Sequence, residues 1–303
     1  MNEARQRSLR LLDTADDIAG SPQPSNADLV FSAREFVQAT LPHRSPRGNP
    51  QEWYRRNGNY TLSIRPGFKN DPKTGARQCV GYPYGTIPRL LLFWVTTEAL
   101  RAKSRKLWLG PSLSAFMREI GLNPDNGGTG AKRSDARRLR DQLDRLFRAT
   151  ISFHYEDGKV ERFINMPLVE EAEFWWNPKD PAQIDLFESW IDLGPKFYEA
   201  IVANPVPADF RALRALKSSP LALDLYTWLA YRAHRVTQAD KPVRISWRQL
   251  LDQIGADYGE TRDFKPRFKE ALAKVLALYP AMRVELAHGG VVIHPCPSLT
   301  AVR

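Results

Sequence analysis

The stretch Ser112-Leu-Ser-Ala-Phe-Met-Arg-Glu-Ile-Gly121 has a counterpart 134 residues further along the chain, Ser246-Trp-Arg-Gln-Leu-Leu-Asp-Gln-Ile-Gly255. Each copy begins with serine, a favourable helix N-cap, and ends with glycine, which suits a C-cap. Between these ends the apolar residues recur at steps of three and four, so they form one helical stripe. Each stretch therefore predicts a short helix that stops at a sharp turn.

A basic helix and a hairpin are expected after each of these short helices. The first basic helix is expected at about residues 131–150, before a hairpin of residues 151–164, and the second starts after Asp263, before a hairpin of residues 282–294. A short capped helix, a turn and a longer positively charged helix make up a helix-turn-helix, and the hairpin adds the wing of a winged helix. The sequence therefore predicts an α+β fold with two tandem winged-helix domains.

The chain has 303 residues, 43% of them hydrophobic, and is long enough to bury two cores. Residues 81–203 are expected to form the first winged-helix domain and residues 204–303 the second, joined by a linker that Pro205 and Pro207 stiffen. Residues 1–80 are expected to form an irregular, partly ordered N-terminal extension, because residues 41–80 are rich in Gly, Pro, Asn and Arg, with one strand at residues 60–64.

The charge of the chain favours a polyanionic partner. The net charge is +10 and the pI about 9.7. Residues 100–150 hold 12 basic and 5 acidic side chains, and residues 205–303 hold 15 basic and 9 acidic ones. Residues 151–194, between the two basic segments, hold 3 basic and 10 acidic side chains. A basic surface could simply keep the protein soluble, but positive charge that coincides with both repeats favours DNA binding.

The first basic helix is expected to read DNA with its N-terminal end, which enters the major groove in a helix-turn-helix. Its leucines fall on one face and its arginines mostly on the other. Arg133, Ser134 and Arg137 are expected at base edges, with Lys132, Arg138 and Arg140 nearer the phosphates. The alternative is a solvent-facing helix laced by pairs such as Arg137 with Asp141.

The first wing and the second basic helix supply further cations. Lys159 and Arg162 are available in the first hairpin, although acidic neighbours such as Glu156 and Glu161 favour contact at the wing tip alone. In the second helix Phe264 and Phe268 are expected to point inward, with Pro266 in the first turn. The cations expected outside are Lys265, Arg267, Lys269 and Lys274.

An enzyme is the rival class of function, and the sequence offers little for it. It contains no GxxxxGK[ST] loop for ATP, and its two cysteines, Cys79 and Cys296, cannot form a metal cluster. Its longest wholly apolar run near the middle, residues 90–95, is too short to span a bilayer. We therefore expect a cytoplasmic protein with no catalytic residues, metal or cofactor. The five histidines lack metal-ligand spacing: His43, His154, His234, His288 and His294.

Several runs resemble plasmid-encoded RepA-type replication initiators over about residues 81–295. They are Tyr82-Pro-Tyr-Gly-Thr-Ile-Pro-Arg-Leu, Leu113-Ser-Ala-Phe-Met-Arg-Glu-Ile-Gly-Leu with its Gly127-Gly128 loop, Arg138-Leu-Arg-Asp-Gln-Leu, Ser219-Pro-Leu-Ala-Leu-Asp-Leu-Tyr-Thr-Trp-Leu and Phe268-Lys-Glu-Ala-Leu-Ala-Lys-Val-Leu-Ala-Leu-Tyr-Pro. The resemblance is specific because these motifs fall in order with the expected spacing. Pro266 departs from it, since a basic or polar residue is expected there.

The resemblance implies a protein that binds repeated sites, called iterons, in the double-stranded DNA of a plasmid origin. It also implies opening of an adjacent AT-rich segment, recruitment of the host replicative helicase and host initiator, repression of its own gene, and a homodimer formed through the first domain. Residues 90–100 and 184–202 are the candidate self-association surface. The alternative function is a winged-helix transcriptional repressor without a replication role, binding an inverted repeat.

Overall fold

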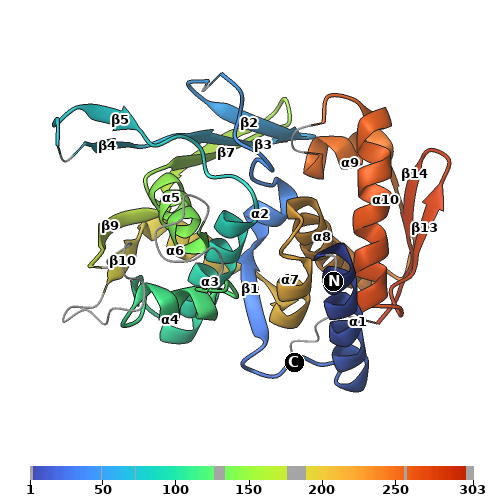
Figure 1. Ribbon diagram of the computed structural model, residues 1–303. Helices are drawn as coiled ribbons and strands as arrows, with labels where there is room; N and C mark the ends of the chain where they lie inside the picture. The colour runs from blue at the N-terminus through green and yellow to red at the C-terminus, as the bar shows by residue number, and fades with distance from the viewer. Residues whose placement is uncertain are drawn as a thin grey trace. The chain divides into compact units, whose positions relative to one another are not determined.

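The computed structural model describes residues 3–48, 50–71, 73–125, 134–175, 189–255 and 258–297, and the chain divides into two compact units (Figure 1). The unit that contains both chain ends, here called the terminal unit, consists of residues 1–43, 55–58 and 205–303. The central unit consists of residues 44–54 and 59–204. Both units combine helices with antiparallel sheets, so the predicted α+β fold is confirmed.

The terminal unit contains the complete second winged helix. Its elements are α8 (Pro220–Ala239), β12 (Val243–Ser246), α9 (Trp247–Ile254), α10 (Thr261–Leu278), β13 (Val284–Ala287) and β14 (Gly290–Ile293). Strand β14 lies between β12 and β13, pairing Ser246 with Gly290 and Val284 with Ile293. Phe264 and Phe268 of α10 are fully buried, as predicted, because their helical spacing places them on one face.

The central unit has the same helix order and a larger set of strands. Its helices are α3 (Thr86–Ala102), α4 (Leu113–Glu119), α5 (Asp135–Phe147) and α6 (Pro195–Ala203). Its strands are β3 (Tyr60–Arg65), β4 (Phe68–Asn70), β5 (Arg77–Cys79), β6 (Lys106–Trp108), β7 (Thr150–Glu156), β8 (Glu161–Pro167), β9 (Val169–Glu173) and β10 (Trp190–Leu193), while β2 (Trp53–Asn57) passes from this unit into the terminal one.

The wing of the central unit is built into a sheet with a strand from the expected extension. Strands β7 and β8 form the predicted hairpin, and β7 also pairs with β3, with Leu62 opposite Phe153 and Ile64 opposite Ile151. Leu62 and Ile64 are fully buried, which explains the pairing energetically. Strand β10 lies between β6 and β9 in a separate three-stranded sheet, which has the same number of strands as the sheet of β12, β14 and β13 in the second module.

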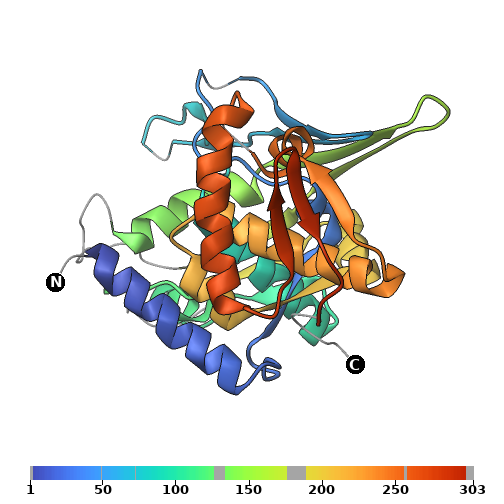
Figure 2. The ribbon, with the colours of Figure 1, turned by 90° about the vertical axis from the view of Figure 1, so that its right-hand side faces the viewer.

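The first 43 residues contribute three elements to the terminal unit: α1 (Glu3–Gly20), β1 (Leu29–Ala33) and α2 (Arg34–Gln38). Figure 2 shows α1 beside the lower part of α10. Strand β1 pairs with β11 (Pro205–Asp209), which the sequence assigned to a linker. The two prolines fit there because β11 pairs on one side only, so their missing N–H groups can face away from the ladder.

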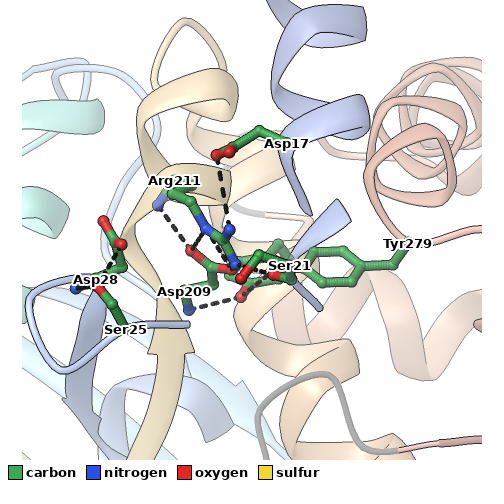
Figure 3. Close-up of polar contacts among 8 residues, drawn as sticks. Asp17, Ser21, Ser25, Asp28, Asp209, Arg211 and Tyr279 are labelled. Carbon is green, nitrogen blue, oxygen red and sulfur yellow. Dashed lines mark hydrogen bonds and ion pairs between the residues drawn. The ribbon is translucent and has the colours of Figure 1, made fainter. Parts of the chain in front are cut away.

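A buried ion pair fastens the end of α1 to β11 and the helix after it, α7 (Phe210–Leu216) (Figure 3). Arg211 donates to the fully buried carboxylate of Asp209 (Nη2 to Oδ2, 2.8 Å) and to the carbonyl of Ser21 (2.9 Å). It also lies 3.6 Å from the carboxylate of Asp17 in α1. The Asp209 N–H donates to the hydroxyl of Tyr226, whose burial raises its pKa. The N-terminal helix is therefore part of the folded terminal unit.

Replacing Arg211 with alanine should lower the free energy of unfolding by about 3–5 kcal/mol, because it leaves Asp209 as a buried carboxylate without its counter-ion. Urea denaturation followed by circular dichroism measures the change. The matched control is Arg214→Ala on the same helix, whose exposed side chain lies over Phe210 and should cost less than about 0.5 kcal/mol. Equal effects of the two variants would contradict the role of the buried pair.

Candidate nucleic-acid interface

The two short helices have the caps that the sequence predicts. In α4 the hydroxyl of Ser112 accepts from the N–H of Ala115 at 3.2 Å. In α9 the hydroxyl of Ser246 accepts from the N–H of Gln249 at 3.3 Å, and the side-chain oxygen of Gln249 accepts from the N–H of Ser246. Gly121 adopts a positive φ of 79°, but Gly255 does not, and a β-carbon at Gly255 would collide with the backbone of Leu251. The glycines thus serve different needs at equivalent turns.

A hydrogen bond from a tryptophan indole is found in both modules, at positions separated by the same interval as the two short helices. In the central unit the indole N–H of Trp94 in α3 donates to Oε1 of Glu119 at the end of α4, at 2.7 Å. In the terminal unit the indole N–H of Trp228 in α8 donates to Oε1 of Gln253 in α9, also at 2.7 Å. Trp228 follows Trp94 by 134 residues, and Gln253 follows Glu119 by the same number. This repeat was visible in the sequence, but the sequence analysis did not predict the bond. Trp94 is a buried packing residue that meets Phe116 edge to face.

Helix α5 has one buried face and one charged face, as predicted. Leu139, Leu143 and Leu146 are buried, while Arg137 and Arg138 are exposed. Ser134 is the N-cap of α5: its side chain is buried and accepts from the Arg137 N–H at 3.3 Å. A buried capping hydroxyl does not project toward a base, so the structure argues against the base contact expected for Ser134. Lys132 and Arg133 lie outside the described residues.

Most cations of α5 already have an acidic neighbour. Arg138 pairs with Asp135 at 2.8 Å, and Arg145 pairs with Asp141 at 2.8 Å. These are pairs of the kind that the alternative interpretation expects, although among the described contacts Asp141 has Arg145 and not Arg137 as its partner. Arg148 pairs with Asp144 at 3.4 Å. Among the cations that the structure describes on α5, Arg137 is exposed and has neither an ion pair nor a side-chain hydrogen bond.

Arg140 is packed rather than presented to solvent. Its guanidinium carbon lies 4.9 Å from the centroid of the Phe174 ring, and one guanidinium nitrogen is buried without a hydrogen-bond partner. Burial lowers the pKa of Arg140. Its role near phosphates stays a prediction, and a phosphate contact would have to reach a guanidinium that is partly covered by Phe174.

Helix α10 begins at Thr261, earlier than the sequence predicts, so Pro266 lies inside the helix rather than in its first turn. The proline ring is exposed, which places it on the outer surface together with Arg262 and Lys269. Arg262, a cation that sequence reasoning missed, has 83% of its side chain exposed, and among the described residues its ion pairs are the long ones with Glu260 and Asp263, at 3.9 and 3.7 Å.

The four predicted cations of α10 fall into two groups. Arg267 and Lys274 both pair with Glu270, at 3.3 and 2.9 Å, and these contacts, the bond from Lys274 foremost, lower the pKa of the Glu270 carboxyl. Lys265 lies 5.5 Å from the centroid of the Trp247 ring, and Lys269 is exposed. Lys265 and Lys269 thus remain available to a polyanion without breaking an ion pair.

Both wings end in tight turns. At the tip of β7 and β8 the Asp157 carboxylate accepts from the N–H groups of Lys159 and Val160, at 2.9 Å each, and these bonds lower its pKa. Lys159 and Arg162 are exposed there, as expected. At the second wing Arg244 of β12 is exposed beside the turn at Gly289, a wing cation that sequence reasoning missed because its strand precedes the hairpin.

Within the residues that the structure describes, no group of three or more His, Cys, Asp or Glu side chains could hold a metal ion. His43 is instead buried and bonded to Asp224, with 2.8 Å between Nε2 and Oδ2. Across the same described ranges, every helix is too short or too polar to cross a membrane.

Comparisons with known proteins agree with this geometry. Residues 82–249 match the family model described as plasmid-encoded RepA protein, which is more than half of the chain. Among solved structures, a crystal structure of domains 2 and 3 of RctB, determined from selenomethionine derivatives, is similar with a TM-score of 0.51 and 14% identity, covering 86% of this chain and 96% of that one. That likeness concerns the fold alone. No curated protein sequence matches the chain significantly.

Glu119→Gln should make unfolding less sensitive to pH. Partial burial of the carboxylate is the largest influence on it and raises the pKa of Glu119 above its ordinary 4.5, outweighing the bond from Trp94. A carboxyl with a raised pKa binds its proton more tightly in the folded state, so its contribution to stability falls as pH rises from about 4.5 through the raised pKa. Glutamine keeps the acceptor for Trp94 and removes the titration, as Gln253 does in the second repeat.

Urea titrations of wild type and Glu119→Gln between pH 4 and pH 8 measure this difference. The variant should gain stability over the wild type toward pH 8. Glu171→Gln, which removes an exposed charge on β9 and does not involve the Trp94 bond, serves as the control. Parallel pH profiles for wild type and Glu119→Gln would show that burial of the Glu119 carboxyl does not make stability depend on pH.

Proposed function

Because the chain belongs to the plasmid-encoded RepA family of replication initiators, we propose that it binds iterons in the double-stranded DNA of a plasmid origin. The observation that carries the proposal is the duplicated module, in which α5 and α10 each bury one face and expose cations on the other. Two such helices can address neighbouring major grooves, roughly 34 Å apart along one face of the duplex. One chain then grips one repeat at two places.

Arg137 is the residue we assign to base reading in the first module. It is exposed, lies in the first turn of α5 and needs no ion pair to be broken before it meets a base. A bidentate arginine recognises O6 and N7 of guanine, which discriminates against other bases by about 1–3 kcal/mol. Arg138 is then left to a neighbouring phosphate, which can take over from Asp135 as its partner.

In the second module we assign Arg262, Lys265 and Lys269 to the phosphates that border the groove. Arg267 and Lys274 can join them if phosphates replace Glu270, because exposed ion pairs of this kind contribute only about 0–1 kcal/mol. Lys159 and Arg244 would contact the backbone from the two wings. Such contacts supply affinity and strong salt dependence but no sequence information.

Origin opening, in this proposal, draws on binding energy and host enzymes. The sequence has no ATP-binding loop, so strand separation in the AT-rich segment has to be driven by bending or destabilising the duplex. The chain would act in the cytoplasm, recruit the host replicative helicase and host initiator, and repress its own gene when bound upstream.

Self-association is proposed through the later of the two candidate segments. Residues 90–97 of α3 are buried within the chain, so this stretch cannot be offered to a second copy as expected. In the described part of residues 184–202, Trp190 is half-buried and Lys196, Glu199 and Val202 of α6 are exposed. A homodimer of the family type would therefore use β10 and α6.

Footprinting combined with permanganate probing tests the proposal on the plasmid's own origin. An initiator should protect direct repeats singly and make thymines in the adjacent AT-rich segment reactive. The rival, a transcriptional repressor, should protect an inverted repeat and leave the thymines unreactive. Protection of an inverted repeat without reactive thymines would reject the initiator role.

Arg137→Ala should weaken binding to the repeat by roughly 5- to 150-fold, the equivalent of one lost bidentate contact, while affinity for random duplex stays almost unchanged. Fluorescence anisotropy with both duplexes measures the ratio. Lys269→Ala is the matched comparison: it should weaken both complexes alike and reduce the slope of log K against log salt by about one. Equal loss on both duplexes for Arg137→Ala would remove it from base reading.

A further inference from the structure

We propose that the hairpin formed by β4 and β5 is a cationic arm that binds the DNA backbone beside the groove occupied by α5. The inference rests on the proposed function and adds a contact surface to it. Figure 1 shows the hairpin projecting next to α5 within the central unit. Its residues lie in the segment that the sequence assigned to an irregular extension.

The hairpin contributes nothing to the core. Strands β4 and β5 pair only with each other, from Phe68 opposite Cys79 to Asn70 opposite Arg77, and every residue in them is exposed. A two-stranded hairpin alone is marginally stable in water. The hairpin therefore adds little buried apolar surface, because Phe68, its one large apolar side chain, is still 48% exposed.

Specific contacts hold the base of the arm against the last turns of α5. Gly67 lies so close to Arg148 that a β-carbon there would collide with the Arg148 carbonyl. The Val80 N–H donates to the Gly67 carbonyl at 3.0 Å and closes the hairpin. Lys69 of β4 lies 2.7 Å from the carboxylate of Asp144 in α5. The arm is thus anchored to the helix that the proposed function places in the major groove.

The tip of the arm is also ordered by its own side chains. The Asp71 carboxylate accepts from the N–H groups of Lys73 and Thr74, at 2.9 Å each, and these bonds lower the pKa of Asp71. Across the strands the Arg77 guanidinium lies 4.9 Å from the centroid of the Phe68 ring. Asp71, the one acidic residue of the arm, therefore stabilises the turn, while the cations lie on the surface.

The charge of the arm selects the partner. The arm carries three exposed cations, Lys69, Lys73 and Arg77, and one acid, Asp71. Lys69 is paired with Asp144 of α5, so Lys73 and Arg77 are the cations of the arm without an ion pair among the described residues. The phosphates of a DNA duplex are a suitable partner for these exposed cations, because a contact with a phosphate needs a positive side chain but no pocket. Since the arm is anchored at the C-terminal end of α5, it would meet the backbone flanking the groove rather than base edges.

Cys79 provides a native probe of the arm. It is exposed at the end of β5, whereas Cys296 is buried. An iron-EDTA chelate coupled to Cys79 of the full chain should cut the origin duplex at a few backbone positions along one border of each protected repeat. Cys79→Ser treated with the same reagent is the control and should give no cuts.

Salt titrations test the energetics independently. Lys73→Ala with Arg77→Ala should weaken binding to the repeat and to random duplex alike and should reduce the slope of log K against log salt by roughly two. Arg214→Ala on α7, an exposed cation that belongs to none of the proposed DNA contacts, should leave that slope unchanged. Thermal unfolding should be alike for the variants and wild type, because the changed side chains are exposed.

The outcomes separate this inference from the function on which it rests. Binding by wild type with no Cys79-directed cuts, and with an unchanged slope in the double variant, would overturn the arm and leave the initiator proposal standing. If the double variant instead lost affinity for polyglutamate alone, the arm would be a surface for an acidic protein, and the inference would again be wrong. Failure of wild type to bind any duplex would reject both proposals.

Discussion

Each long basic helix is attached to its unit by one apolar face, and the rest of the interface depends on that attachment. Leu139, Leu143 and Leu146 secure α5, and Phe264 and Phe268 secure α10. Full burial of such a side chain contributes about 1.5–3 kcal/mol, enough to hold a charged helix at the surface. The indole hydrogen bond that repeats in both modules then joins α3 to α4 and α8 to α9. The turn between the short and the long helix of each module therefore has a defined geometry.

Acidic residues beside the cations shape the charged faces of both helices. On α5 they engage Arg138, Arg145 and Arg148, and on α10 Glu270 engages Arg267 and Lys274. Exposed pairs of this kind are weak, so phosphates can displace the acids at little cost. In our proposal these pairs hold long side chains near the surface without removing them from binding, and Arg137 in the first turn of α5 is the cation assigned to a base.

The two modules are consecutive in the sequence, but the units are not. Residues 1–43 complete the unit that holds the second module, through β1 on β11 and through the Arg211 network at the end of α1. Strand β3 completes the wing sheet of the first module from a position about 90 residues before its partner strand. Shortening the chain at either end would therefore remove strands and buried contacts from a folded unit rather than trim a loose extension.

The elements with local signals could be predicted from the sequence: the capped short helices, the two amphipathic basic helices and both hairpins. Serine caps, helical periodicity and turn residues act over a few positions, so they can be read from neighbours in the chain. Contacts between distant parts of the chain had to be found in the fold: the pairing of β3 with β7, the pairing of β1 with β11 at the presumed linker, the packing of Arg140 on Phe174 and the ion pair of Lys69 with Asp144. These partners lie tens of residues apart or more, and they are selected by burial and charge matching in the folded chain, which no local pattern encodes.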